Sequence, residues 1–460
     1  MKKVILTLIA ACAALAAIVA IYRFGFRKSI PEAEPAVQVE AILAQNNCYQ
    51  CHDAAAVKPF YGKLPLIGPM LDLHIGRGTK FVDLKKESLE NPSETFLAKL
   101  EYSVQHGNMP LVEYKLMHWG TGFNKKEKSL LTEWILSERA SRYSTGLSAP
   151  EFAGEPVQVM PESVPTCPQK VALGQKMFND TRISLDNTIS CASCHILEDG
   201  GAGHADERTS EGIYGLHGGV NAPTAFNALF NADQFWNGRA HTLAEQAAGP
   251  PVNPVEMGDQ TWDQIVERLR GDKALVREFQ ALYPEGLTAE TVCDAIAEFE
   301  KTLITPNDKL DRYLKGESGA LTEAELAGYQ AFKENCCATC HVGKTLGSQS
   351  FEYMGIFEDY FADREQRFPE IEYCADDEGL VGFTNDPADR HKYKVPNLRL
   401  VTLTAPYYHD GSRVTLEDAV RDMFRFELGK TPSDETVSSI CTFLGTLEGE
   451  SEWFREASEQ

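Results

Sequence analysis

The sequence has few basic residues for the number of acidic ones. It carries 44 Lys and Arg against 67 Asp and Glu in 460 residues, a formal net charge of −23. Binding to nucleic acid needs a basic face for the phosphates, so we expect no nucleic-acid partner. The acidity is typical of an exported soluble surface, or of a face that receives a basic partner. The length predicts about three domains.

The sequence also lacks a cleavage site where an export signal would need one. The segment Val4 to Tyr22 is almost wholly apolar and has close to the roughly 20 residues that span a bilayer. No A-x-A site follows it, and the basic stretch Arg23 to Lys28 comes instead. We interpret residues 1–28 as an uncleaved N-terminal transmembrane anchor. An alternative is a lipid on Cys12, at the end of the loose lipobox Ile9-Ala10-Ala11-Cys12.

What the chain does have is a cysteine motif that occurs three times at nearly even spacing. Two cysteines separated by two residues are followed at once by histidine, in Cys48-Tyr49-Gln50-Cys51-His52, Cys191-Ala192-Ser193-Cys194-His195 and Cys337-Ala338-Thr339-Cys340-His341. This pattern is typical of covalent haem c attachment, with the histidine as proximal iron ligand. Zinc also takes paired cysteines, but it does not require a histidine directly after every pair. We therefore expect three haem c groups.

Haem attachment of this kind occurs outside the cytoplasm, which predicts an inner-membrane protein that crosses once and has its haem domains in the periplasm. An oxidising periplasm permits disulfides. The sequence does not reveal how the remaining cysteines pair; they are Cys167, Cys293, Cys336, Cys374 and Cys441.

Helical patterns after each motif predict an all-α fold of three cytochrome c-like haem modules behind a transmembrane helix. We expect domains at residues 1–28, 36–145, 161–310 and 311–460. A capping box at Asn124 and Glu127, and caps at Thr288 and Ser433, begin the closing helices. The second and third modules share Gly-x-x-x-Phe upstream of the haem, where glycine would let a helix cross closely. The Pro-, Gly- and Ser-rich segment 145–165 separates the first module from the others.

Distal ligands decide which irons carry electrons and which have an open position. Methionine opposite histidine raises the potential. For the first haem Met109 fits, in Asn108-Met109-Pro110, and for the third Met423 fits; for the second, spacing alone offers Met257. Competitors of Met109 are His74, His106, His118 and Met117. A ligand on every iron would make the protein a pure electron carrier.

A resemblance to a known family changes which residues we expect to bind the second iron. Residues 165–447 resemble bacterial di-haem cytochrome c peroxidases, and with the extra module and the anchor the whole chain is similar to tri-haem quinol peroxidases. The segments that carry the resemblance are 221–227 (Asn-Ala-Pro-Thr-Ala-Phe-Asn), 234–240 (Gln-Phe-Trp-Asn-Gly-Arg-Ala), 244–250 (Ala-Glu-Gln-Ala-Ala-Gly-Pro), 253–257 (Asn-Pro-Val-Glu-Met) and 403–411 (Leu-Thr-Ala-Pro-Tyr-Tyr-His-Asp-Gly). The front module resembles small haem-binding domains through its motif and the later Met109-Pro110 and Tyr114.

The resemblance implies that hydrogen peroxide is reduced at the second haem. It assigns a general acid–base role to Glu256, a pocket role to Gln246, and electron transfer between the haems to Trp236, while Met257 becomes a packing residue. It makes Met423 the distal ligand of the third haem. It also implies a calcium ion held by Asn221, Thr404 and Pro406, whose oxygen donors suit that metal.

One departure from the family concerns the second iron. Many members place a distal histidine where this chain has Ile213, so we expect a permanently open iron, with His217 as an alternative ligand. Electrons would come from a membrane quinol through the first and third haems. Two alternatives are a soluble cytochrome c as donor and a non-catalytic tri-haem carrier.

Overall fold

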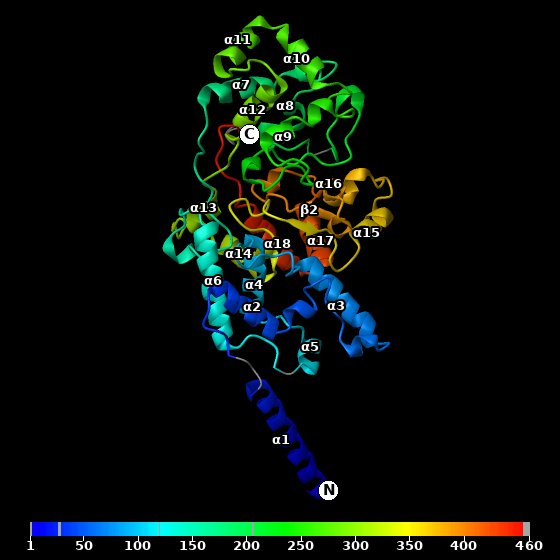
Figure 1. Ribbon diagram of the computed structural model, residues 1–460. Helices are drawn as coiled ribbons and strands as arrows, with labels where there is room; N and C mark the ends of the chain where they lie inside the picture. Colours follow the sequence, from blue (N-terminus) through cyan, green and yellow to red (C-terminus); the bar gives the residue numbers. More distant parts are fainter. Residues whose placement is uncertain (1, 26–28, 119, 205–206, 454–460) are drawn as a thin grey trace. The chain divides into compact units, whose positions relative to one another are not determined.

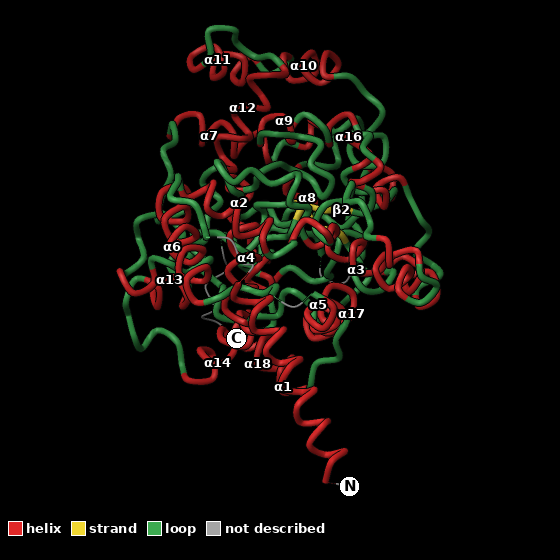
Figure 2. Tube along the Cα trace, turned by 60° about the horizontal axis from the view of Figure 1, so that its bottom comes forward, coloured by secondary structure: helices red, strands yellow, loops and turns green. Residues whose placement is uncertain are grey.

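The computed structural model describes residues 2–25, 29–118, 120–204 and 207–453, and most of their regular structure is helical (Figure 1). Their strands are β1 (Phe351–Tyr353) and β2 (Lys392–Lys394), an antiparallel pair drawn yellow in Figure 2. The chain divides into two compact units, residues 1–144 and 145–460. The expectation of a mainly helical protein is confirmed.

The first unit contains one isolated helix and a small helical core. Its helices are α1 (Lys2–Gly25), α2 (Pro35–Gln45), α3 (Ile67–Phe81), α4 (Glu94–His106), α5 (Val112–Met117) and α6 (Lys125–Arg142). The predicted capping box begins α6, because the Asn124 side chain accepts from the Glu127 amide at 2.9 Å. Behind it, Leu131 and Ile135 are buried against α2 and α4.

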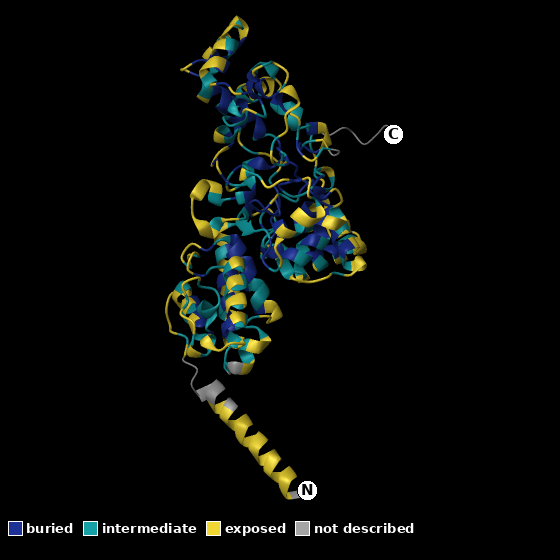
Figure 3. Ribbon diagram, turned by 90° about the vertical axis from the view of Figure 1, so that its right-hand side faces the viewer, coloured by how far each residue is buried: buried dark blue, intermediate teal, exposed yellow. Residues whose placement is uncertain are grey.

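Helix α1 covers the segment expected to cross a bilayer. Figure 3 shows its described residues exposed along the helix. Within the residues described, no helix combines the length and the hydropathy needed to cross a membrane, so the expected transmembrane helix is not found among them.

The second unit holds the other two motifs. Its helices are α7 (Pro168–Phe178), α8 (Cys191–Cys194), α9 (Leu243–Ala247), α10 (Trp262–Arg270), α11 (Lys273–Leu282), α12 (Ala289–Glu300), α13 (Lys309–Leu314), α14 (Glu323–Glu334), α15 (Tyr360–Arg367), α16 (Val381–Thr384), α17 (Leu416–Leu428) and α18 (Asp434–Leu444). Thr288 and Ser433 cap α12 and α18 as predicted, since each side chain accepts a backbone N–H three residues on. The caps fix where the two closing helices start.

Two pairs of helices cross at glycine, and each pair precedes and closes one haem module. At Gly174 in α7, an added Cβ would lie 1.8 Å from the carbonyl oxygen of Ala295 in α12. At Gly328 in α14, an added Cβ would lie 2.2 Å from the carbonyl oxygen of Ser439 in α18. Both glycines therefore allow a backbone contact that no other residue permits.

Aromatic rings repeat beside each crossing. Phe178 lies edge-on to Phe299 with ring centroids 5.2 Å apart, and Phe332 lies 5.2 Å from Phe443. All four rings are almost fully buried. The two modules of the second unit are thus built on the same helix pair, as the shared Gly-x-x-x-Phe predicted.

The segment 145–165 is packed onto the third motif's module. The backbone N–H of Gly343 donates to the Pro156 carbonyl at 2.8 Å. Val157 and Val159 are fully buried in the apolar core that also holds α14 and α18. The division between the units falls at the start of this segment, between residues 144 and 145.

Gly174→Ala should destabilise the second unit. Alanine normally favours a helix over glycine by roughly 0.5–1 kcal/mol, but here its methyl group meets the Ala295 carbonyl, and overpacking costs about 1–3 kcal/mol. Thermal unfolding followed by circular dichroism measures the sign. Gly76→Ala in α3 is the control, because an added Cβ there meets nothing within 4 Å. Equal or raised stability of Gly174→Ala would contradict the close crossing.

Candidate functional site

The histidine of each motif is half-buried, with its Nδ1 hydrogen-bonded to a backbone carbonyl. Since a carbonyl only accepts, Nδ1 must donate and Nε2 keeps its lone pair free to bind iron. The bonds are His52 to Gly78 and to Val82 (3.0 Å each), His195 to Gly201 (3.1 Å) and His341 to Leu346 (2.9 Å). Burial lowers the pKa of His52 and His195, and lowers that of His341 to about 4. Each ring is therefore neutral, as a metal ligand must be.

The paired cysteines of the three motifs lie on short helical turns directly before these histidines. The turns are Cys48–Gln50, Cys191–Cys194 and Cys337–Thr339, and all six thiols are free. Burial raises the pKa of Cys48 and Cys337 to about 12, so these thiols are neutral in apolar surroundings. This arrangement fits covalent haem c at each motif.

In the first unit, the structure distinguishes among the proposed distal ligands. His118 is engaged at both ring nitrogens: Nε2 meets the Tyr61 hydroxyl at 2.7 Å, and Nδ1 donates to the Tyr114 carbonyl at 3.2 Å. His106 is exposed on α4. Met109 is half-buried in the loop between α4 and α5. His74 lies in α3, and the side chain of Met117 lies outside the described residues. Met109 stays the predicted ligand.

Glu256 lies near the second motif. Its charge contributes to raising the pKa of the Cys194 thiol, which places the carboxylate near that motif. Burial raises the pKa of Glu256 itself, while Arg239 partly opposes this and Asp376 adds to it. Asn253 holds the carboxylate through an Nδ2–H donated to Oε1 at 2.7 Å. A half-buried carboxyl with a raised pKa suits a group that takes up and returns a proton.

Ile213, which stands where we expect no ligand for the second iron, adjoins Glu256. Ile213 is fully buried, and its backbone N–H donates to the Glu256 carbonyl at 2.9 Å. His217 is exposed, and its Nδ1 donates to the Thr209 carbonyl at 2.9 Å. Met257 lies in the apolar core of the second module, 3% exposed, which agrees with a packing role. Gln246 lies half-buried in α9, which packs against α12.

Trp236 is fixed between segments from both modules. Its Nε1–H donates to the Asn221 carbonyl at 2.9 Å, and its own carbonyl accepts from the Lys394 N–H at 2.9 Å. The indole ring lies edge-on to the imidazole of His409, with centroids 6.5 Å apart. Trp236 therefore connects three segments: the loop that holds Asn221, the strand β2 and the loop before α17.

Two of the three predicted calcium ligands, Asn221 and Pro406, are in contact next to Trp236. The Asn221 side-chain amide contacts the Pro406 carbonyl, and Thr404 lies two residues before Pro406. The Asn221 backbone N–H donates to the His409 carbonyl at 2.7 Å, which fastens this loop to the third module. An amide side chain and backbone carbonyls are all oxygen donors, the set that calcium prefers.

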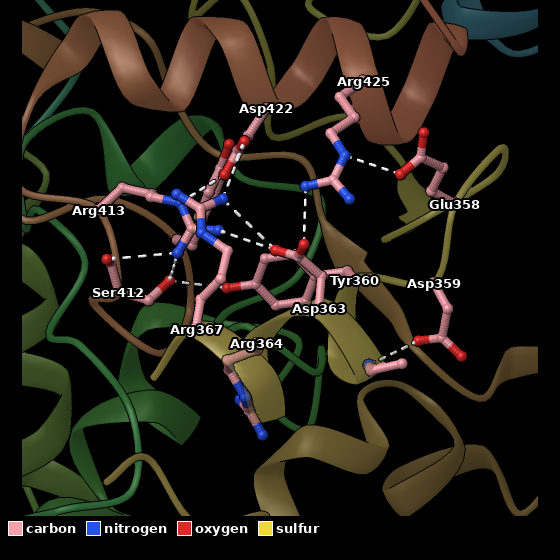
Figure 4. Close-up of polar contacts among 12 residues, drawn as sticks. Glu358, Asp359, Tyr360, Asp363, Arg364, Arg367, Ser412, Arg413, Asp422 and Arg425 are labelled. Carbon is pink, nitrogen blue, oxygen red and sulfur yellow. Dashed lines mark hydrogen bonds and ion pairs between the residues drawn. The ribbon is translucent and has the colours of Figure 1, made fainter. Parts of the chain in front are cut away.

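A cluster of ion pairs fixes the helix that carries Met423. Figure 4 shows Asp422 and Arg425 of α17 directed at residues of α15 and of the loop before α17. Arg413 pairs with Asp422, and Arg425 Nη1 lies 2.7 Å from Asp363 Oδ1. Met423 itself is half-buried on α17. The cluster sets the rotation of α17 and so the direction of the predicted ligand.

No pattern in the sequence pointed to a second buried cluster near Trp236. Arg364 reaches Asp377 at 2.7 Å and Asp410 at 3.0 Å, and His409 Nε2 lies 2.9 Å from Asp377. These pairs hold the pKa of Asp377 well below its usual range, against the opposing effect of burial. Arg239, whose charge faces Glu256, was also missed as a separate pocket residue. Asp410 and Arg239 lie within the family-like segments, whereas nothing marked Arg364 and Asp377.

Comparison with known proteins identifies both parts of this arrangement. Residues 168–319 match the model of the di-haem cytochrome c peroxidases, and residues 26–137 match that of a haem-binding domain. Cytochrome c peroxidase Ccp of Escherichia coli (strain K12) is 42% identical over 90% of this chain and 88% of its own length. The chain belongs to the bacterial cytochrome c peroxidase family.

Other relatives agree with this assignment. Cytochrome c551 peroxidase of Nitrosomonas europaea is 39% identical over 70% of this chain and 91% of its own length. A crystal structure of a MauG-like protein associated with microbial copper homeostasis superposes with a TM-score of 0.55 at 28% identity, covering 65% of this chain and 97% of that one. This peroxidase therefore holds several c-type haems and acts on hydrogen peroxide.

Glu256→Gln should lower peroxide turnover by about 10²–10⁴-fold, because glutamine cannot exchange the proton that a general acid–base group moves. Wild-type turnover should fall as the pH drops through the raised pKa of Glu256, at a higher pH than for an ordinary glutamate. Steady-state kinetics against pH measures both.

The control for Glu256→Gln is Glu267→Gln, since the Glu267 side chain is 80% exposed on α10. Turnover should not change in this variant. If Glu256→Gln leaves turnover unchanged and Met257→Ala gains a new high-spin haem, Met257 is instead the ligand of the second iron.

Proposed function

We propose that the protein is a periplasmic tri-haem peroxidase that takes its electrons from membrane quinol. Electrons pass from the first haem, on His52, to the third, on His341, and cross by Trp236 to the second, on His195. The observation that carries the proposal is the half-buried Glu256 carboxylate near the second motif, with Ile213 in the slot where a distal histidine would stand. A site with an acid–base group and an open position suits chemistry, and the two other sites suit electron transfer.

The chain's own residues would handle the protons of the reaction. When bound, haem supplies the iron at which the O–O bond of peroxide is broken. Glu256 would take a proton from one peroxide oxygen and deliver it to the other, held in place by Asn253. Arg239 would steady the charged form of Glu256, since it lowers the pKa that burial raises. Gln246 would hydrogen-bond the substrate and orient it.

Metal and haem ligands complete the proposal. Met109 and Met423 would be the distal ligands of the first and third haems and raise their potentials. A calcium ion on Asn221, Thr404 and Pro406 would join the loop of the second module to that of the third, where Trp236 crosses.

The extra haem-binding module and α1 support quinol as the donor. Large apolar residues of α1 are exposed along its length, from Val4 at 63% to Ile21 at 62%. Exposed apolar surface of this extent marks an interaction with a membrane or a partner. We propose that residues 1–28 anchor the protein in the inner membrane, with the haem units on the periplasmic side, where the first haem could meet quinol. A soluble cytochrome c is the second candidate donor, favoured by the net charge of −23, which would attract a basic protein.

Removal of the first haem should separate the two donors. In Cys48→Ala/Cys51→Ala, quinol-dependent peroxide turnover should fall to background, while turnover with a small artificial reductant should remain. Reduced quinone or reduced cytochrome c serves as the sole donor in parallel assays. Undiminished quinol oxidation by the variant would exclude the first haem from the path, and turnover with cytochrome c alone would favour the second candidate.

Asn221→Ala should weaken calcium binding and make turnover depend on added calcium. Removal of even an outer partner of a metal site costs about 10–100-fold in affinity, so loss of a direct ligand should cost at least that. Metal analysis and turnover after chelation measure the effect. Asn385→Ala is the control, since Asn385 is exposed in α16's C-terminal turn. Wild-type protein that keeps full activity without calcium would count against the site.

A further inference from the structure

Lys394 is a buried cation that differs from the others in the described part of the chain. It is 7% exposed at the end of β2, and burial lowers its pKa to about 8. The other buried cations reach an acidic side chain or a carbonyl within hydrogen-bond or ion-pair distance: Lys99 with Phe81, Arg139 with Glu94, Arg364 with Asp377, Arg399 with Asp308 and Arg413 with Asp422. Among the described residues, no carboxylate forms an ion pair with Lys394.

Asp233 does not fill this role. Its charge partly opposes the effect of burial on Lys394, but its Oδ1 lies 2.6 Å from Nδ1 of His241. An ammonium group without an anion is costly to bury. The surroundings of Lys394 therefore call for an anion that the polypeptide does not supply.

The backbone around Lys394 lies next to the third haem motif. Two residues further on, the Pro396 carbonyl lies near the His341 ring, whose pKa it helps to raise against the effect of burial. The Val395 carbonyl accepts from the Ser348 N–H at 2.7 Å, close to Leu346, whose carbonyl also holds His341. Two residues span about 7 Å of a strand, and the lysine side chain is of similar length. The Lys394 ammonium group is thus within reach of the edge of a haem on His341.

Haem c carries two propionate groups that stay anionic after its vinyl groups have joined the cysteines. We propose that the Lys394 ammonium group pairs with a propionate of the third haem, and that Lys394 is thereby a positioning residue that sets the potential of this haem. The inference rests on the third haem proposed above, not on the identity of the electron donor. A cation at this place disfavours the more positive ferric state, so its removal should lower the potential.

The test measures the midpoint potential of each haem in the holoprotein by spectroelectrochemistry, with Lys394→Gln, Lys394→Arg and Lys392→Gln. Lys392 is a matched control, because it lies two residues away on the same strand and its Nζ pairs with Asp389 at 3.0 Å. The third haem is identified by its absence from Cys337→Ala/Cys340→Ala. In Lys394→Gln its reduction should be disfavoured about tenfold, which is 59 mV for one electron. Lys394→Arg should restore the potential, and Lys392→Gln should leave it unchanged.

Three results would overturn the proposal. One is an unshifted third haem in a Lys394→Gln protein that retains it, and another is a shift of the second haem instead. If Lys394→Gln does not take up the third haem, Lys394→Arg decides: uptake with a normal potential supports the charge pair, and failure of uptake overturns it. The haem content of the wild-type protein is counted as well. A wild-type protein without a third haem would refute the proposed function, which is a separate outcome from failure of the Lys394 proposal.

Discussion

The histidine of each motif must present Nε2 to an iron while its ring is largely removed from water. This is tolerated because Nδ1 donates to a backbone carbonyl, so the ring loses no hydrogen bond on leaving water. The carbonyl comes from α3 for His52, from a glycine turn for His195 and from a short loop for His341. The path of the chain around each motif depends on this one bond. It also keeps the ring in the tautomer and orientation that iron ligation needs.

Buried ion pairs hold together the segments that follow the third motif. Arg364, Asp377 and Asp410 form one closed set, and Arg413 and Asp422 belong to another. Removing one partner of such a buried pair typically costs about 3–5 kcal/mol, because it leaves a charge without compensation. The first set includes Asp377, which also pairs with His409, and the His409 ring contacts Trp236, so this side of the Trp236 ring is held by electrostatics as well as by packing.

The peroxide pocket follows a different rule. Glu256 is half-buried and forms no ion pair with any residue that the structure describes, and burial raises its pKa more than Arg239 and Asn253 lower it. A strong ion pair would have lowered the pKa of the carboxylate and made it a weaker base. Next to it, the backbone N–H of Ile213 donates a hydrogen bond to the Glu256 carbonyl. The same segment thus positions the acid–base group and fills the slot with an apolar side chain.

The sequence by itself determined the features that depend on neighbours along the chain. The three haem motifs, the caps at Asn124, Thr288 and Ser433, and the glycines at 174 and 328 were readable because spacing and local backbone chemistry are enough to recognise them. Family-like segments added Glu256, Trp236 and Asn221. Only the tertiary structure decided which carbonyl holds each histidine, that Arg239 and Asp376 act on Glu256, and that Lys394 is buried without an acid beside it. These facts depend on residues far apart in sequence, and burial and charge act through space, so no local pattern records them.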